Sequence, residues 1–287
     1  MSESWSHPPA DATELAERLD AVGLAARTAD LAALARPSAR LHTLDGAGDR
    51  VGGSRLGGEP DLRAEDAWPR DGEGRPLSFL LQVDLAEVRA ALGPNDLPDA
   101  GVLAFFYDAA GQPWGFDDDD PLQWRVLHLP AGAPLAPRPL PDDHHPENRF
   151  TSCPVLVAAE PVFADVGDFE VTDVLGTDDA ALEAYETAVP PRQDFAHRLL
   201  GRPETIQNDL RFDAALAATV AAGGAGEPAA EPTAEVAGRW RLLAQVDSDE
   251  ERTEMMWGDS GRLYFVMTEE DLRARAWDRV RVVLQCC

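Results

Sequence analysis

FLLQVDLAEVRAALGPNDLPDAGVLAFFYD, at residues 79–108, is the stretch that decides the fold. A short apolar run leads into Gln82-Val83-Asp84, and a second apolar run covers residues 102–107. Short apolar runs that are rich in aromatic residues and bounded by Gly, Pro and Asp are typical of buried strands. The stretch therefore predicts two strands joined by a short helix at residues 85–92, which Gly93 and the following proline would end.

A looser copy of the same pattern lies at residues 242–267, LLAQVDSDEERTEMMWGDSGRLYFVM. Gln245-Val246-Asp247 takes the place of Gln82-Val83-Asp84, and Gly-x-Leu-x-Phe follows in both copies. Each half also ends in a further candidate strand. We interpret the chain as a tandem duplication and expect a mainly β fold with a few helices, made of roll-like antiparallel sheets from two duplicated halves.

Composition divides the chain further. Residues 1–37 are expected to form an N-terminal helical extension, 38–130 the first β-rich half, 131–150 a Pro-rich linker loop, and 151–287 the second β-rich half. A low-complexity insert of Ala, Gly and Pro at 221–238 interrupts the second half. We expect this insert to bury little surface.

The strongest compositional feature is negative charge. The chain has 52 Asp and Glu residues against 25 basic ones, which gives a formal net charge of −27 at pH 7. Because proteins that bind nucleic acids need a basic footprint, this balance argues against a nucleic-acid partner. Three explanations stay open: solubility, adaptation to a salt-rich habitat, and a field that steers a basic partner.

The sequence shows neither a targeting signal nor a disulfide framework. No apolar run approaches the roughly 20 residues of a membrane-spanning helix. The first residues lack the basic and apolar regions of a signal peptide. We therefore expect a cytoplasmic protein with no membrane partner. Cys153, Cys286 and Cys287 show no disulfide framework, and the last two lack the spacing of a metal site, so we expect them to end a strand.

Several motifs that suggest chemistry fail on their spacing. The glycines of residues 45–60 match no phosphate-binding loop, and the chain has no lysine for a Walker motif. The carboxylates at 117–120 lack the alternating ligands of a calcium loop, and the neighbouring histidines in DDHH at 142–145 cannot easily share one ion. His197 has no nearby Ser or Cys in the sequence, and no G-x-S-x-G occurs. We therefore expect no metal, no cofactor and no catalytic residue.

Several motifs taken together resemble the YwqG-like family of bacterial proteins of unknown function. They follow one another along most of the chain from about residue 40, although the insert and the N-terminal extension depart from the family pattern. The resemblance implies a mainly β, roll-like fold, and it brings no established catalytic residues. The motifs are Gly57-Gly58-x-Pro60, Trp68-Pro69, Pro76-Leu77-x-Phe79-Leu80-Leu81-Gln82-Val83-Asp84, Gly101-x-Leu103-x-Phe105-Phe106-Tyr107, His197-Arg198-Leu199-Leu200-Gly201-x-Pro203 with Gln207, and Leu243-x-Gln245-Val246-Asp247 through Trp257-Gly258-Asp259-x-Gly261-x-Leu263-x-Phe265.

The resemblance also implies a function. Members of the family are similar to proteins of bacterial toxin–immunity systems, which implies an intracellular module that binds and neutralises a toxin. A basic toxin would suit the acidic composition. In this interpretation Trp257 and Asp259, in the second hairpin, contact the partner protein. The competing interpretation is that Trp257 packs beside its turn.

A second group of candidate binding residues comprises Gln82, Asp84, Gln245 and Asp247. They would either form a paired polar site between the two halves or satisfy buried backbone groups there. The alternative function is therefore an enzyme or small-ligand binder with a carboxylate-containing site between the halves. Carboxylate pairs carry out acid–base chemistry when burial separates their pKa values. A deep pocket around Asp84 and Asp247 would favour that alternative, whereas a shallow acidic face would favour the protein binder.

Overall fold

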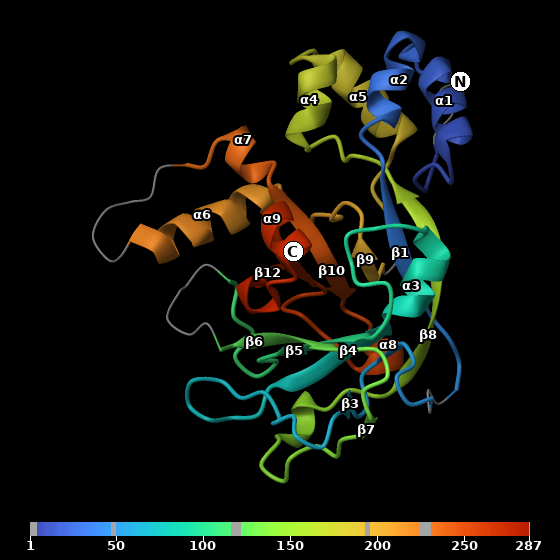
Figure 1. Ribbon diagram of the computed structural model, residues 1–287. Helices are drawn as coiled ribbons and strands as arrows, with labels where there is room; N and C mark the ends of the chain where they lie inside the picture. Colours follow the sequence, from blue (N-terminus) through green and yellow to red (C-terminus); the bar gives the residue numbers. More distant parts are fainter. Residues whose placement is uncertain (1–4, 47–49, 116–121, 193–195, 224–230, 287) are drawn as a thin grey trace.

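One large antiparallel sheet dominates the computed structural model, which describes residues 5–46, 50–115, 122–192, 196–223 and 231–286 (Figure 1). The sheet curls into a nearly closed barrel, and a small second sheet pairs β3 (Asp61–Leu62) with β7 (Ala136–Pro137). The expected mainly β fold is confirmed. The strands of the large sheet, in spatial order, are β12 (Arg281–Gln285), β11 (Arg262–Thr268), β10 (Trp240–Asp247), β9 (Arg198–Leu200), β1 (Arg36–Thr43), β8 (Cys153–Val162), β2 (Arg55–Leu56), β4 (Ser78–Asp84), β5 (Val102–Tyr107) and β6 (Trp124–Leu129).

The two sides of the sheet match each other around the central β1–β8 pair. On one side lie β2, β4, β5 and β6, and on the other β9, β10, β11 and β12. Gln82 of β4 pairs with Ala104, and Gln245 of β10 pairs with Tyr264. A β-bulge precedes each glutamine at the same distance in its hairpin. The glutamines thus occupy equivalent places, while the tandem duplication itself stays an interpretation of the sequence.

The interior of the barrel holds the main hydrophobic core. Because side chains alternate along a strand, Phe105 of β5 and Phe265 of β11 both face inward. Their ring centroids lie 5.1 Å apart in an edge-to-face arrangement. The outer face of the second hairpin is covered by α6 (Leu210–Gly223), and the outer face of the first packs against Trp68. The two hairpins are therefore buried on both faces, as their continuous apolar runs predict.

The two edges of the sheet are connected through one loop and one indole. Trp124 of β6 donates its indole N–H to the carbonyl of Val280, just before β12, at 2.7 Å. The amide of Leu284 in β12 donates to the carbonyl of Trp114 at 3.3 Å. Gly115 follows with φ +87°, and a Cβ there would lie 1.8 Å from the carbonyl oxygen of Val282. The loop before β6 thus needs glycine at position 115 to approach β12.

Replacing Gly115 by alanine is expected to lower the free energy of unfolding by about 2–3 kcal/mol, because it adds left-handed backbone strain and a collision with β12. Chemical denaturation of the two proteins measures this loss. Gly132→Ala is the matched control, since Gly132 has φ +79° and open space around its Cβ position. Equal losses for the two variants would show that the contact with β12 does not exist.

Four helices form a lobe beside one end of the sheet, at the top of Figure 1. Its hydrophobic core is separate from that of the barrel and includes Leu15, Leu19 and Tyr185. The side chain of Asp11 caps α1, because it accepts hydrogen bonds from the amides of Thr13 and Glu14. Half of the lobe comes from the N-terminal extension and half from the chain between β8 and β9. The helices are α1 (Ala12–Ala21), α2 (Thr28–Ala32), α4 (Phe169–Leu175) and α5 (Asp179–Ala188).

Leu44 lies just beyond the end of β1 and is 43% exposed. The insert at 221–238 contains α7 (Ala234–Ala237), and among its residues 231–238 Ala237 is the buried one, so this part of the insert buries little surface, as expected. Residues 224–230 lie outside the described part. The remaining helices are α3 (Leu85–Leu92), ended by Gly93 as expected, α8 (Glu250–Thr253), α9 (Glu269–Ala274), and the short 3₁₀ turns Ala25–Arg27, Pro146–Asn148 and Trp277–Arg279.

A membrane-spanning helix is not found in the described parts of the chain, where each helix is too short or too polar to cross a bilayer.

Candidate functional site

The polar residues predicted between the halves lie in two separate sites, one in each half. In the first, Gln82 accepts a hydrogen bond from the amide of Asp61 at 2.9 Å. Its amide nitrogen donates to the carbonyl of Gly53 at 2.8 Å and to the Asp61 carboxylate at 2.7 Å. Arg55 of β2, the strand that pairs with Gln82, donates to the same carboxylate at 2.9 Å. Gln82 therefore ties β4 to the segment that follows β2.

The second half repeats this arrangement with different side chains. Gln245 accepts from the amide of Glu204 at 3.0 Å and donates to the carbonyl of Ala196 at 3.1 Å. Arg198 of β9 donates to the Glu204 carboxylate at 2.8 Å. Within the described residues no hydrogen bond joins Gln82 to Gln245. Both glutamines satisfy backbone groups of their own half, as the structural interpretation of this pair requires.

The two aspartates are also occupied within their own halves. Asp84 caps α3 by accepting from the amide of Ala86 at 2.9 Å, and its carboxylate lies 3.2 Å from Arg50. Asp247 is buried, accepts from the amide of Ala196 at 2.8 Å and pairs with Arg262 at 3.0 Å. The structure does not bring Asp84 and Asp247 together. The paired carboxylate site of the alternative function is therefore not formed by these two residues.

Trp257 is fully buried, so the prediction that it offers an exposed ring to a partner is wrong. Its indole has 0% exposure and packs edge-to-face against Tyr107 and Phe150, with ring centroids 5.8 Å and 5.5 Å away. The aromatic contacts come from β5 and from the loop before β8, which the local sequence around Trp257 does not reveal. Asp259, by contrast, is exposed in the turn before β11.

Trp114 is the exposed aromatic residue beside that turn. It is 46% exposed, although the backbone around it is held firmly. The side chain of Gln112 donates to the carbonyl of Met256 at 3.1 Å and accepts from the amide of Gly258 at 2.8 Å. These bonds join residues 112–114 to residues 256–259, and we name this surface the Trp114 edge. A proline before Trp114, a glycine after it and the nearby carboxylates at 117–120 were the sequence signals of an exposed loop tip that the prediction did not use.

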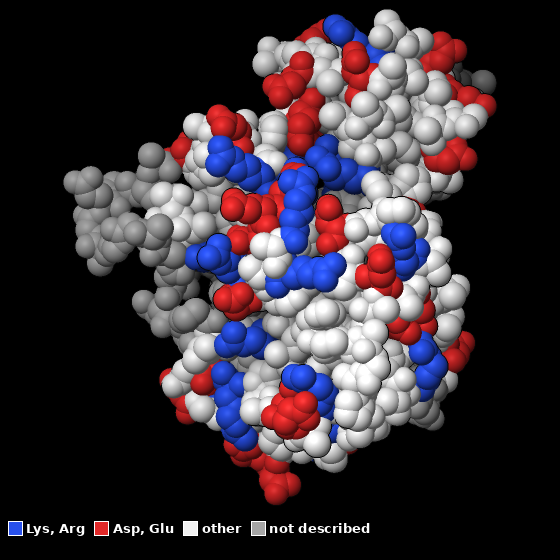
Figure 2. All heavy atoms as spheres, in the orientation of Figure 1, with Lys and Arg blue, Asp and Glu red and all other residues white. Residues whose placement is uncertain are grey.

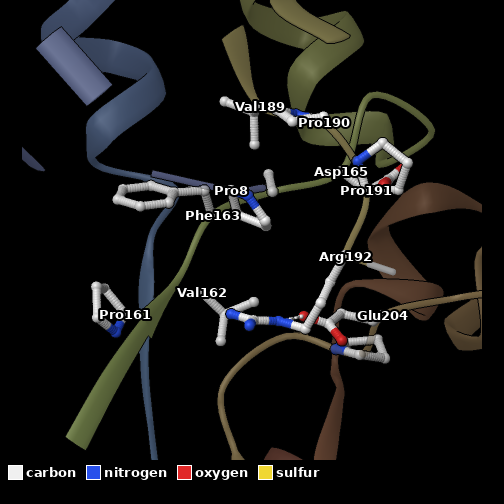
Figure 3. Close-up of a pocket in the computed structure, with 12 residues that line it drawn as sticks. Pro8, Pro161, Val162, Phe163, Asp165, Val189, Pro190, Pro191, Arg192 and Glu204 are labelled. Atoms are coloured by element: carbon white, nitrogen blue, oxygen red, sulfur yellow. Dashed lines mark hydrogen bonds and ion pairs between the residues drawn. The ribbon is translucent and has the colours of Figure 1, made fainter. Parts of the chain in front are cut away.

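A small pocket lies where the lobe meets the sheet (Figure 3). Arg192 extends across it towards Glu204, with its Nε 3.1 Å from a carboxylate oxygen of Glu204. The cavity volume is about 40 Å³, whereas pockets for small ligands usually have about 300–1,000 Å³. As it stands, the pocket admits only a very small group. Its lining consists of Pro8, Pro161, Val162, Phe163, Ala164, Asp165, Val189, Pro190, Pro191, Arg192, Pro203 and Glu204.

A buried network of charges joins the lobe to the sheet next to this pocket. Asp168, the residue before α4, accepts from Arg202 and Arg211, both at 2.9 Å. Arg211 also pairs with Glu170 at 2.7 Å and with Asp209 at 2.5 Å. All of these side chains are buried or nearly so. Buried ion pairs therefore contribute to holding the lobe against the sheet.

Burial and ion pairing act in opposite directions on the two lobe carboxylates. Burial raises the pKa of Asp168 to about 6, and the attraction of Arg202 and Arg211 only partly offsets that effect. Burial also acts to raise the pKa of Glu170, but the hydrogen bond from Arg211 and the charge of Arg202 outweigh it and lower that pKa to about 2. At neutral pH both carboxylates are ionised, and the ionised form is less favourable for Asp168 than for Glu170.

The described residues contain no group of three or more His, Cys, Asp or Glu side chains placed to hold a metal ion. His144, from the DDHH run, is buried against Trp68 with ring centroids 6.2 Å apart. Burial raises the pKa of the Cys153 thiol, which disfavours the nucleophilic thiolate. Among the described residues, His144 packs against Trp68, and the Cys153 thiol donates to the carbonyl of Leu44 at 3.4 Å.

A protein-family model matches most of the chain. Residues 54–286 match the model of a protein family described as "Domain of unknown function (DUF1963)". The matched range contains the first hairpin, the second hairpin and both glutamines with their partners Asp61 and Glu204. No curated protein matches the chain.

Proposed function

The chain belongs to the DUF1963 family, and from this premise we propose that it is a protein-binding module, YwqG-like and immunity-like, that holds a basic protein such as a toxin on an acidic surface. The proposal places the contact at the Trp114 edge. It replaces Trp257 with Trp114 as the aromatic contact and keeps Asp259.

The single observation that carries the proposal is the exposure of Trp114 on a fixed backbone. Tryptophan is enriched among the few residues that dominate the affinity of protein interfaces. A side chain that is already held in place loses little conformational freedom on binding. The bonds from Gln112 and Leu284, and the close approach of Gly115 to β12, provide that rigidity.

The charge around the Trp114 edge supports a basic partner. Glu250, Glu251, Glu254 and Asp259 are all exposed in the segment that leads to and includes this edge. The arginine among them, Arg252, pairs with Asp45 at 3.2 Å. A negative surface attracts a basic protein over a distance of about 8 Å at physiological salt. A lysine or arginine of the partner could also stack on the exposed indole face.

Replacing Trp114 by alanine is expected to weaken binding of the partner about 30-fold or more, the effect of losing a central interface residue. The partner is first captured from lysate and medium of the source strain and its relatives, and identified by mass spectrometry. Calorimetry with the purified partner then measures the affinity. The free energy of unfolding should change by less than about 1 kcal/mol, because the lost side chain is half exposed.

Leu156→Ala is the matched control for this experiment. Leu156 is 55% exposed on β8, so this substitution removes an exposed apolar side chain elsewhere on the sheet. Its affinity for the partner should equal that of the unmodified protein. Full affinity in Trp114→Ala, or loss of binding only in Leu156→Ala, would contradict the placement of the contact. Absence of any specific basic partner at low salt would contradict the function itself.

A small-ligand binder or enzyme remains the second candidate, favoured by the pocket at the base of the lobe. The pocket contains the carboxylates of Asp165 and Glu204 beside an apolar, proline-rich wall. Thermal-shift screening of metabolites tests this candidate. Stabilisation by a metabolite that is lost in Asp165→Asn would favour it.

A further inference from the structure

Arg36 is an arginine whose side chain has no polar partner among the described residues of this strongly acidic protein. Other arginines close to the lobe, such as Arg198, Arg202 and Arg211, pair with carboxylates. Arg36 begins β1 and is partly buried. Its backbone pairs with Val162 of β8, but over the residues that the structure describes its side chain forms no hydrogen bond and no ion pair. A partly buried cation usually acquires a partner, because burial penalises an unpaired charge.

The strand register places other arginines at the level of Arg36. In the antiparallel β1–β9 pairing Ser38 lies opposite Leu200. Arg36 precedes Ser38 by two residues and Arg202 follows Leu200 by two, so the register places the two arginines at the same level. The β9–β10 pairing, in which Leu199 lies opposite Ala244, brings Arg241 to that same level. Positive side chains are gathered between the lobe and the sheet, with carboxylates among them (Figure 2).

The neighbours of Arg36 are already engaged with groups of their own. Arg202 donates to Asp168 and to the carbonyl of Leu34, and Arg241 donates to the carbonyl of Gly238 at 2.6 Å and pairs with Glu269. Burial lowers the pKa of Arg36, and the charges of Arg241, Arg202 and Arg211 lower it further, while Glu170 acts in the opposite direction. The charges around Arg36 are therefore mainly positive, and its guanidinium is the donor that stays available for a ligand.

The chemistry of that donor defines the ligand. A guanidinium offers five N–H donors in a planar fork that matches the oxygens of a carboxylate or a phosphate. Partial burial strengthens such a pairing, since water competes less for the donors. We propose that Arg36 is the centre of an oxyanion-binding site at the base of the lobe, with Arg241 and Arg202 as flanking positive charges. The site is independent of the protein-binding function proposed above.

Titration of the full-length protein with inorganic phosphate, at constant ionic strength, tests this site. The melting temperature should rise in a saturable manner, because a ligand that binds only the folded state stabilises it. In Arg36→Ala the apparent affinity should fall about tenfold or more, and Arg36→Lys should retain part of it, since lysine keeps the charge but loses the fork. A parallel titration with acetate distinguishes a phosphate preference from a general preference for oxyanions.

The behaviour without anion separates a binding role from a structural one. Arg36→Ala should melt at the same temperature as the unmodified protein or higher, because it removes a cation that faces other cations. Arg125→Ala is the control, since Arg125 is a partly buried arginine of β6 at the far edge of the sheet; it should keep the full phosphate response. No saturable shift with either anion, an unchanged response in Arg36→Ala, or a lower melting temperature of that variant without anion would each overturn the proposal.

Discussion

Trp257→Ala is expected to lower the free energy of unfolding by about 3–5 kcal/mol, the usual cost of deleting a large aromatic side chain from a core. Trp257 is fully buried and lies between Tyr107 of the first hairpin and Phe150 of the loop before β8. The cavity would remove contacts that join three segments far apart in the sequence. Equilibrium denaturation in guanidinium chloride or urea measures the loss.

Trp257→Phe provides the matched comparison, because it keeps an aromatic ring. The indole N–H of Trp257 has no hydrogen-bond partner among the described residues, so its removal leaves no bond broken. Phenylalanine should therefore recover most of the stability, with a remaining loss of about 1–2 kcal/mol from its smaller volume. A loss below about 1 kcal/mol in Trp257→Ala would mean that the side chain is exposed after all.

Arg211→Ala should have a cost of similar size, about 3–5 kcal/mol at pH 7, because three buried or nearly buried carboxylates lose a paired cation and Arg202 is left to serve Asp168 and Glu170. Arg211 pairs with Asp168, Glu170 and Asp209, and its guanidinium lies 4.5 Å from the ring centroid of Phe169. Arg239→Ala is the control, since Arg239 forms only an exposed pair with Glu235. It should change stability by less than about 1 kcal/mol.

The cost of Arg211→Ala should also depend on pH. The pKa of Asp168 is raised from 3.8 to about 6, so its contribution to stability is complete below the lower value and is lost as the pH rises through the upper one. The pKa of Glu170 is lowered from 4.5 to about 2, so its contribution is present above 4.5 and is lost towards pH 2. Of these two carboxylates, Asp168 is therefore the one that changes the free energy of unfolding between about pH 4.5 and 6.

Removal of Arg211 takes away one charge that favours ionised Asp168, so the pKa of Asp168 should rise further. The variant should then lose more stability at pH 7 than at pH 5, by about 1 kcal/mol for a rise of one pKa unit and by at most about 1.4 kcal/mol for a larger rise, because Asp168 is then protonated at both pH values. Denaturation curves at the two pH values test this difference. A cost that is the same at pH 5 and pH 7 would show that Asp168 does not titrate in this range.

Local patterns in the sequence predicted the strands and several helix ends well. The apolar runs of β4 and β5 are bounded by Gly, Pro and Asp, and the structure places β5 at the predicted residues 102–107. The end of α3 at Gly93 depends on residues within the same turn, so local sequence was sufficient to predict it. Strand β9 was missed because it has only three residues, one of them a buried arginine.

The parts that could not be predicted depend on contacts between distant segments. Trp257 looks like a turn residue in its local sequence, and its burial comes from Tyr107 and Phe150. The charges of Asp168 and Glu170 acquire their role only through Arg202 and Arg211, which lie beyond β9 in the chain. Periodicity and spacing carry no information about such pairs. For this reason the sequence located the strands but did not locate the exposed aromatic residue or the buried ion pairs.

The lobe has a consequence for the order in which this protein is made. Arg18 of α1 donates to the carbonyl of Ala188 at the end of α5, across a separation of 170 residues. At about 5–20 residues per second of synthesis, the first helix waits roughly 10 to 30 s for its partner. During that time Leu15 and Leu19, fully buried in the finished lobe, have no α5 to cover them. The many carboxylates of this region can keep the waiting helix dispersed in water, which gives the acidity of the lobe a use during biosynthesis that is independent of any partner.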